Sequence, residues 1–223
     1  FALILLLYEV REERHRERTN YRDRLTENLD FPFTEFRPAQ RNVAARNYKA
    51  IVSGEHLLLE APTGSGKSIG ALYPAVKALR KDEKIFFLTA RNSGAEAAIK
   101  ASLLLQEKNS ALTCVELTAR RKACFCERVG EEKTSCPFSK GYYDRSMSAT
   151  NELLSLGSAV KSEIEKVAEK HSVCPFELSL DTATWADIVV GDLNYVFDPY
   201  VALKRFQDRK RFILLVDEAH QLA

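Results

Sequence analysis

The glycine-rich stretch Ala61–Ser68 constrains the fold more than any other part of the sequence, because it reads Ala-Pro-Thr-Gly-Ser-Gly-Lys-Ser. It follows an apolar run, Leu57–Leu59, that predicts a buried strand, and it precedes a helical pattern from about Ser68 to Leu79. A strand, a glycine-rich loop with Lys-Ser and a helix together form a phosphate-binding loop. Ala61 replaces the usual first glycine, which is a small change where φ stays negative.

This loop carries the residue types that a nucleotide phosphate bound with magnesium requires. Glycines let the backbone point its N–H groups at phosphate oxygens, and the N-terminus of the next helix adds positive potential. Lys67 can reach the terminal phosphates, and the Ser68 hydroxyl can coordinate Mg²⁺. A plain Gly/Ser turn is the weaker alternative, because strand, loop and helix all fall where the motif needs them. The candidate nucleotide-binding residues of the loop are Thr63, Gly64, Ser65, Gly66, Lys67 and Ser68.

Beyond the loop, the sequence alternates between helical patterns and apolar runs typical of buried strands. This alternation predicts an α/β fold with a parallel, doubly wound sheet. A chain of 223 residues with 45% hydrophobic residues can bury the core of such a fold. The expected strands are Lys84–Leu88, Leu112–Leu117, Trp185–Val190 and Phe212–Val216, and the expected helices include the stretch ending near Leu105, Tyr142–Leu156 and Val160–Lys170.

The last apolar run, Phe212–Val216, is followed by Asp-Glu-Ala-His at residues 217–220. A strand that ends in two acidic residues is the usual partner of a phosphate-binding loop. Asp217 can hold Mg²⁺, and Glu218 can orient and deprotonate the attacking water. Together with the glycine-rich loop, this strand end predicts an NTPase with Lys67, Asp217 and Glu218 as its catalytic residues.

Three further side chains are candidates for nucleotide or nucleic-acid contacts. Gln40 falls on the first turn of a predicted helix that ends at Gly54, and its amide can offer a donor and an acceptor to an adenine edge. An exposed helical glutamine is an equally good interpretation. Thr89 and Arg91 follow a predicted strand, where they could hold a nucleic-acid backbone or cap the next helix.

Five cysteines and no recognisable secretory signal favour a reducing cytosol, with thiols used in the core or on a metal. Cys114 lies in a strand pattern and fits a small buried core residue. Cys124, Cys126, Cys136 and Cys174 lie in or beside an irregular segment, and four thiolates can bind zinc or an iron–sulfur cluster. Unligated loop thiols are the weaker alternative, and the residues alone leave the metal open.

Residues 1–30 contain an apolar stretch, Phe1–Tyr8, and a segment dense in Arg and Glu, Arg11–Arg24. Phe1–Tyr8 is too short to span a membrane, and the mixed charges of Arg11–Arg24 predict a solvated helix. The net charge of +2 excludes a global basic field, so any contact with nucleic acid has to be local. The abrupt ends of the sequence predict a piece of a longer protein.

A series of short motifs occurs in the order of one known family: Phe33–Gln40, Ala61–Ser68, Phe87–Arg91, Lys122–Cys124, Cys136–Arg145, Cys174–Phe176, Gly191–Asp198 and residues 217–220. Together they resemble the iron–sulfur DNA helicases of superfamily 2, the XPD/DinG (DEAD_2) group. The resemblance implies a RecA-like motor domain that uses ATP and Mg²⁺ and translocates 5′ to 3′ on single-stranded DNA.

The resemblance also implies a [4Fe–4S] cluster in a mainly helical insertion before the Asp-Glu strand. Cys124, Cys136 and Cys174 match its ligand positions, and Cys126 is the candidate for the remaining one. A second RecA-like domain of the same protein supplies arginine fingers in such motors, so we expect this fragment alone to be poorly active. We further expect no membrane partner, and a bacterial, nucleoid-associated protein of the cytoplasm.

These expectations divide the chain into four parts. They are an N-terminal extension or end of a preceding domain (1–30), the first part of the motor domain (31–117), the cluster insertion (118–176) and the second part of the motor domain (177–223). Two alternatives to an ATP-dependent DNA helicase remain. One is a P-loop NTPase with a zinc-bound regulatory insertion, and the other is a nucleotide-gated nucleic-acid-binding module. Glu218 argues against the second, because a pure binding module needs no water-activating base.

Overall fold

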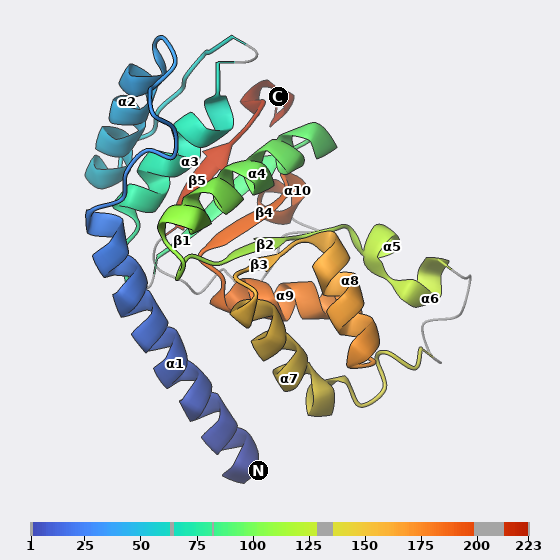
Figure 1. The fold of residues 1–223 in the computed structure, drawn as a ribbon. Helices are drawn as coiled ribbons and strands as arrows, with labels where there is room; N and C mark the ends of the chain where they lie inside the picture. The colour runs from blue at the N-terminus through green and yellow to red at the C-terminus, as the bar shows by residue number, and fades with distance from the viewer. Residues whose placement is uncertain (1, 63–64, 82, 129–135, 199–211, 223) are drawn as a thin grey trace.

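The computed structural model describes residues 2–62, 65–81, 83–128, 136–198 and 212–222 (Figure 1). At its centre is a sheet whose described strands are all parallel and follow the order β3-β2-β4-β1-β5. The predicted parallel α/β fold is therefore confirmed. The strands are β1 (Lys84–Thr89), β2 (Cys114–Glu116), β3 (Ser158–Ala159), β4 (Ile188–Asp192) and β5 (Phe212–Val216).

The longer helices α2, α3, α4, α7 and α8 lie where the sequence patterns predict them. The short helices α5, α6, α10 and η3 were not predicted, and neither was α9, which ends at Trp185, a residue that the sequence placed in a strand. The first residue of α9 is Pro175, and a proline suits this position because it needs no N–H there. No helix in the described part of the chain combines the length and the apolarity needed to cross a membrane. The helices are α1 (Ala2–Glu27), α2 (Gln40–Ser53), α3 (Lys67–Ala78), α4 (Asn92–Lys108), α5 (Arg120–Ala123), α6 (Phe125–Arg128), α7 (Tyr142–Ser155), α8 (Lys161–Lys170), α9 (Pro175–Trp185), α10 (Asn194–Phe197) and the 3₁₀ helix η3 (Ala219–Leu222).

Alternate residues of the central strands enter two separate hydrophobic cores, as expected for a sheet covered on both faces. Phe86 and Leu88 of β1 pack with residues of α7, α8 and α9, whereas Ile85 and Phe87 pack with residues of α3 and α4. The helix predicted at Ser68–Leu79, α3, thus packs against one face of β1, the strand that ends at Thr89.

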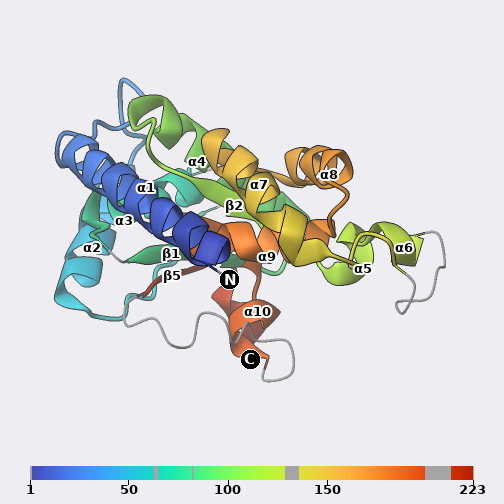
Figure 2. The ribbon, with the colours of Figure 1, turned by 90° about the horizontal axis from the view of Figure 1, so that it is seen from below.

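Residues 118–176 contain four of these helices and also the short strand β3, which pairs with β2 at one edge of the sheet. The short helices α5 and α6 lie at the opposite end of the molecule from α2 in both Figure 1 and Figure 2. The segment that carries Cys124 and Cys126 therefore projects away from the helix that carries Gln40.

The structure corrects two predictions about strands. Residues 55–62 form no helix or strand, and Leu58 is 92% exposed, so the predicted strand at Leu57–Leu59 is wrong. Its three apolar residues are flanked by Glu55, His56 and Glu60, and this run is shorter than the usual strand of about five residues. β5 has the predicted bounds but forms an edge of the described sheet, and Leu214 is 46% exposed.

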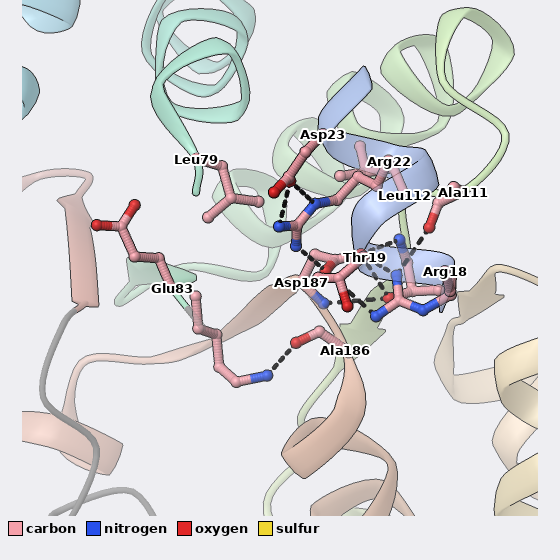
Figure 3. A network of polar contacts seen from close by, with 12 residues as sticks. Arg18, Thr19, Arg22, Asp23, Leu79, Glu83, Ala111, Leu112, Ala186 and Asp187 are labelled. Atoms are coloured by element: carbon pink, nitrogen blue, oxygen red, sulfur yellow. Dashed lines mark hydrogen bonds and ion pairs between the residues drawn. The ribbon is translucent and has the colours of Figure 1, made fainter. Parts of the chain in front are cut away.

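The prediction of a solvated helix at Arg11–Arg24 is wrong for one side of α1. Arg22 is 1% exposed, and its Nη1 lies 2.5 Å from Oδ1 of Asp187, which is 2% exposed. Arg18 reaches the other oxygen of the same carboxylate, with 2.6 Å between Nη1 and Oδ2 (Figure 3). The backbone N–H and the hydroxyl of Thr113 also donate hydrogen bonds to Asp187. These bonds fix α1 to the segment just before β4.

The cations beside Asp187 shift the pKa values of two nearby groups. Burial alone would raise the pKa of Asp187, but the guanidinium groups of Arg18 and Arg22 hold it far below its ordinary value. His15, one turn before Arg18, has its pKa lowered to about 4, first by burial and then by the nearby cation of Arg18. The His15 ring packs edge-on against Trp185, with 5.3 Å between the ring centroids.

Candidate functional site

The described part of the phosphate-binding loop leads directly into α3. Gly66 is the N-cap and has a left-handed φ of 79°, and α3 begins at Lys67. A Cβ atom at this glycine would lie 2.4 Å from Nε2 of Gln40, so both the backbone angle and the space require glycine. Lys67 is exposed and Ser68 is half-buried on the first turn. Thr63 and Gly64 lie outside the described residues.

Gln40 contacts this loop directly. Its Nε2 donates a hydrogen bond to the carbonyl oxygen of Gly66 at 3.2 Å, and its Oε1 accepts one from the backbone N–H of Arg37 at 3.0 Å. Gln40 is 5% exposed and is the first residue of α2. The alternative of an exposed helical glutamine is therefore wrong. The side chain connects the start of α2 to the N-cap of α3.

Asp217 and Glu218 lie at the C-terminal end of β5, beside the end of β1. The backbone N–H of Asp217 donates to the carbonyl oxygen of Leu88 at 2.8 Å, which continues the pairing of the two strands. A Cβ atom at Gly94 would lie 3.1 Å from Oδ2 of Asp217 and 2.2 Å from Oγ1 of Thr89. The absence of a side chain at Gly94 thus leaves room for both polar groups at the start of α4.

Glu218 forms an ion pair that the sequence pattern did not predict. Its Oε2 lies 2.9 Å from Nε of Arg91 and accepts a second hydrogen bond from Nε2 of Gln221 at 3.1 Å. The side chain of Arg91 is 60% exposed and that of Glu218 is 25% exposed. The only sequence signal for this pair was that both residues follow parallel strands, whose C-terminal ends share one edge of the sheet.

The predicted nucleotide-binding and acidic residues thus form two described groups. One contains Gln40, Gly66 and the first turn of α3, and the other contains Asp217 and Glu218 with the loop after β1. Within the described residues, no hydrogen bond or ion pair joins Lys67 or Ser68 to either acidic side chain.

Four of the five cysteines gather at one cavity of about 240 Å³ beside α5, α6, α7 and α9. Each of the four is at most 8% exposed, and Cys126 and Cys136 are in contact, with 2.6 Å between their Sγ atoms. The predicted grouping of these cysteines is therefore observed. The cavity is lined by Arg120, Cys124, Cys126, Cys136, Ser139, Tyr142, Tyr143, Cys174 and Glu177.

Local folding explains how distant cysteines reach this cavity. Cys124 is the C-cap of α5, Cys126 lies in α6, Cys136 precedes the turns before α7, and Cys174 is the N-cap of α9. Phe125 and Phe138 pack edge to face beside them, with 5.0 Å between the ring centroids. Hydrophobic packing therefore holds segments from three parts of the sequence around the thiols.

The thiols differ in their ease of ionisation. Burial would raise the pKa of Cys136, but hydrogen bonds from the Cys126 thiol and from the backbone of Phe138 and Ser139 lower it overall. Burial raises the pKa of Cys174. Within the described residues, no group of three or more His, Cys, Asp or Glu side chains has the geometry to hold a single metal ion.

Cys114 is separate from this group, as predicted. It lies on β2, is 3% exposed and packs in the core with residues of α3 and α4. Burial raises the pKa of its thiol to about 12, although a hydrogen bond with Ser102 acts in the opposite direction. A protonated, buried thiol is typical of a structural core residue.

The comparisons with known protein families agree with this architecture. A family model described as DEAD_2 matches residues 75–223, which is more than half of the chain. The chain belongs to the DEAD_2 family. A second model, described as DEAD/DEAH box helicase, matches residues 37–109, so the two models together cover this DEAD_2 chain from Arg37 onward.

Several curated proteins resemble this DEAD_2 chain. The general transcription and DNA repair factor IIH helicase subunit XPD of Dictyostelium discoideum is 24% identical over 222 residues, covering 86% of this chain and 29% of the relative. The regulator of telomere elongation helicase 1 homolog of Caenorhabditis briggsae is 25% identical over 211 residues, covering 74% of this chain and 21% of the relative. A probable ATP-dependent helicase of Methanocaldococcus jannaschii is 34% identical over 59 residues, which cover 26% of this chain and 9% of that relative.

A solved structure described as an XPD helicase shares the fold. Its TM-score is 0.59 at 18% sequence identity, and the match covers 85% of this DEAD_2 chain and 34% of the solved chain. The chain therefore has the fold of one part of that helicase and spans less than a third of the Dictyostelium and Caenorhabditis briggsae relatives.

Proposed function

We propose that this chain is the first motor domain of an ATP-dependent DNA helicase. The observation that carries the proposal is membership of the DEAD_2 family, because the matched region includes Asp217 and Glu218 and the described relatives are helicases. The exposed Lys67 at the first turn of α3 supports it, since a lysine at a helix N-terminus can reach phosphate groups. The proposed protein binds ATP and Mg²⁺ and moves 5′ to 3′ along single-stranded DNA.

Each group in the proposed nucleotide site has a distinct role. Loop N–H groups and Lys67 hold the phosphates, Ser68 and Asp217 coordinate Mg²⁺, and Glu218 activates water. The buried Gln40 fixes the N-cap of α3 through Gly66 and retains amide capacity for an adenine edge, because each amide atom can form a second hydrogen bond. Arginine fingers come from a second RecA-like domain of the same protein, as in related motors.

We also propose that the four-cysteine cavity holds a [4Fe–4S] cluster. Four buried thiols around one cavity of about 240 Å³ match the number of thiolates that hold such a cluster. Cys124, Cys126, Cys136 and Cys174 are the proposed ligands. When bound, the cluster would provide a thiolate-held covalent link between the α5–α6 segment, the turn before α7 and the start of α9.

The alternative with a zinc-bound insertion is tested by metal analysis of anaerobically purified protein. We expect a brown protein with about four irons per chain, which Cys126→Ser loses and Cys114→Ser keeps. The matched pair is informative because both thiols are buried but only Cys126 lines the cavity. Zinc in place of iron, or dependence on Cys114 rather than Cys126, would contradict the cluster assignment.

The motor function is tested in the full-length protein by ATP hydrolysis with and without single-stranded DNA. Lys67→Ala should abolish the DNA-stimulated rate, because the phosphates lose their cationic partner. Arg46→Gln is a matched control, since Arg46 is an exposed cation on α2 that has no assigned role in the nucleotide site. ATP hydrolysis that is equal in the Lys67→Ala and control variants would refute the proposal.

A further inference from the structure

We propose that Arg91 is a switch. Its ion pair holds Glu218 inactive until a phosphate of single-stranded DNA replaces Glu218 as the partner of the arginine. The inference rests on the proposed function, in which Glu218 activates water. It assigns a regulatory role to the ion pair between the loop after β1 and the end of β5, with 2.9 Å between Nε of Arg91 and Oε2 of Glu218.

The contacts of Glu218 restrict its carboxylate in the paired state, because they occupy one of its two oxygens. A carboxylate oxygen has two lone pairs for hydrogen bonding. Oε2 already accepts from Nε of Arg91 and from Nε2 of Gln221. A water bound at this oxygen therefore has to displace one of these donors, and the ion pair also fixes the direction of the carboxylate.

The backbone of Glu218 is consistent with a group that changes position. Its φ of 55° lies in the left-handed region, which residues with side chains rarely adopt. Such angles persist where surrounding contacts impose them, and they concentrate in switch regions. Here the residue is held by the ion pair with Arg91, by the hydrogen bond from its own N–H to Oδ1 of Asp217, and by two hydrogen bonds that it accepts from Gln221.

Hydrogen bonds fix the backbone of Arg91, whereas its side chain is accessible. Its backbone N–H donates to Oγ1 of Thr89, and its carbonyl oxygen accepts from the N–H groups of Gly94 and Ala95 at the start of α4. The guanidinium group nevertheless remains on the surface, because the side chain is 60% exposed. An incoming anion can reach this group without unfolding the loop that carries it.

A DNA phosphate competes with Glu218 for the same donor. Arginine binds phosphate through two parallel N–H bonds, and this bidentate arrangement can use the Nε edge that now contacts Glu218. Phosphate charge density along the strand strengthens the competition, whereas a single exposed ion pair is weak. DNA binding would therefore release Glu218 from Arg91. ATP hydrolysis would then depend on the presence of single-stranded DNA.

The test compares DNA-free ATP hydrolysis by the full-length parent, Arg91→Gln, Arg91→Lys and the Arg46→Gln control. Arg91→Gln should raise the DNA-free rate by about fivefold, which corresponds to the roughly 1 kcal/mol of an exposed ion pair at 1.4 kcal/mol per tenfold. Stimulation by an oligothymidine strand should fall by the same factor. Arg91→Lys keeps a cation and should keep the DNA-free rate low.

Ionic strength provides a readout that a purely structural role would not change. Salt screens exposed charges, so added NaCl should raise the DNA-free rate of the parent relative to that of Arg91→Gln. Arg46→Gln should follow the parent. A DNA-free rate in Arg91→Gln at or below the control, or equal acceleration by Arg91→Lys and Arg91→Gln, would overturn the switch. Absence of Lys67-dependent hydrolysis in the parent with DNA would instead refute the motor function itself.

Discussion

Replacing Asp187 with alanine is the substitution for which the structure makes the strongest stability prediction. Its carboxylate is 2% exposed and pairs with Arg22, itself 1% exposed, at 2.5 Å. The same group accepts hydrogen bonds from the backbone N–H and the hydroxyl of Thr113, both at 2.8 Å. The substitution therefore removes one of the acceptors of a buried cation and the acceptor of a buried backbone N–H.

The magnitude follows from what each partner can do after the change. Removing one member of a buried ion pair costs about 3–5 kcal/mol. Arg22 keeps Asp23 as a partner, with 2.6 Å between Nη2 and Oδ1, and Arg18 is 20% exposed and can reach water. Both facts place the loss near the lower end, about 3 kcal/mol in the free energy of unfolding.

Urea denaturation of the chain measures this loss by two probes. Far-UV circular dichroism follows all helices, and the single tryptophan, Trp185, reports on the region where α1 meets α9. Coincident transitions would support a two-state treatment. Asp23→Ala is the matched control, because Asp23 also pairs with Arg22 but is 29% exposed. Its removal should cost about 1 kcal/mol or less.

The result that would refute the reasoning is equal destabilisation by Asp187→Ala and Asp23→Ala. It would mean that the buried network does not hold α1 against the sheet. A smaller loss at Asp187 than at Asp23 would contradict the described burial even more directly, since the two carboxylates share the partner Arg22.

Two further predictions concern pH and DNA. The pKa of His15 is lowered to about 4 in the folded chain, against about 6.5 when unfolded, so stability should fall as pH drops through this window, by as much as about 3 kcal/mol. Urea midpoints from pH 7 to about pH 4 should show this decline in the parent and much less of it in His15→Gln; parallel curves would exclude His15 as the cause. Arg120–Lys122 is a further candidate contact for DNA phosphates, because it presents three consecutive exposed cations. Replacing this run with glutamines should weaken single-strand binding for all base sequences alike and reduce its salt dependence, because phosphate contacts carry no sequence information. An unchanged salt slope in a fluorescence-anisotropy titration would exclude the run as a DNA contact.

Strong local patterns predicted most of the fold correctly. β5 spans the predicted Phe212–Val216, and α7 and α8 match their predicted ranges within two residues at each end. These elements succeed because apolar runs and helical periodicity are local properties of the sequence. Leu57–Leu59 shows the limit of such reasoning, since a short apolar run does not specify its partner strand.

Long-range polar contacts could not be predicted from local patterns. The Arg22–Asp187 pair joins residues 165 positions apart, and an Arg-rich helix predicts solvent exposure when no partner is known. The pair between Arg91 and Glu218 likewise joins residues that are far apart in the sequence. Grouping of Cys124, Cys126 and Cys136 was predictable from their concentration in one irregular segment. Cys174 follows two helices, and the contact between Cys126 and Cys136 depends on how α6 and the turn before α7 pack.

Hydrolysis and binding of ATP by Glu218→Gln in the full-length protein test the central claim most directly. This variant keeps the shape of the side chain and the whole phosphate-binding loop but removes the carboxylate that is proposed to activate water. The account predicts ATP binding equal to that of the parent, measured by titration with a fluorescent ATP analogue, together with loss of the DNA-stimulated rate. Hydrolysis by Glu218→Gln at the parental rate would contradict it.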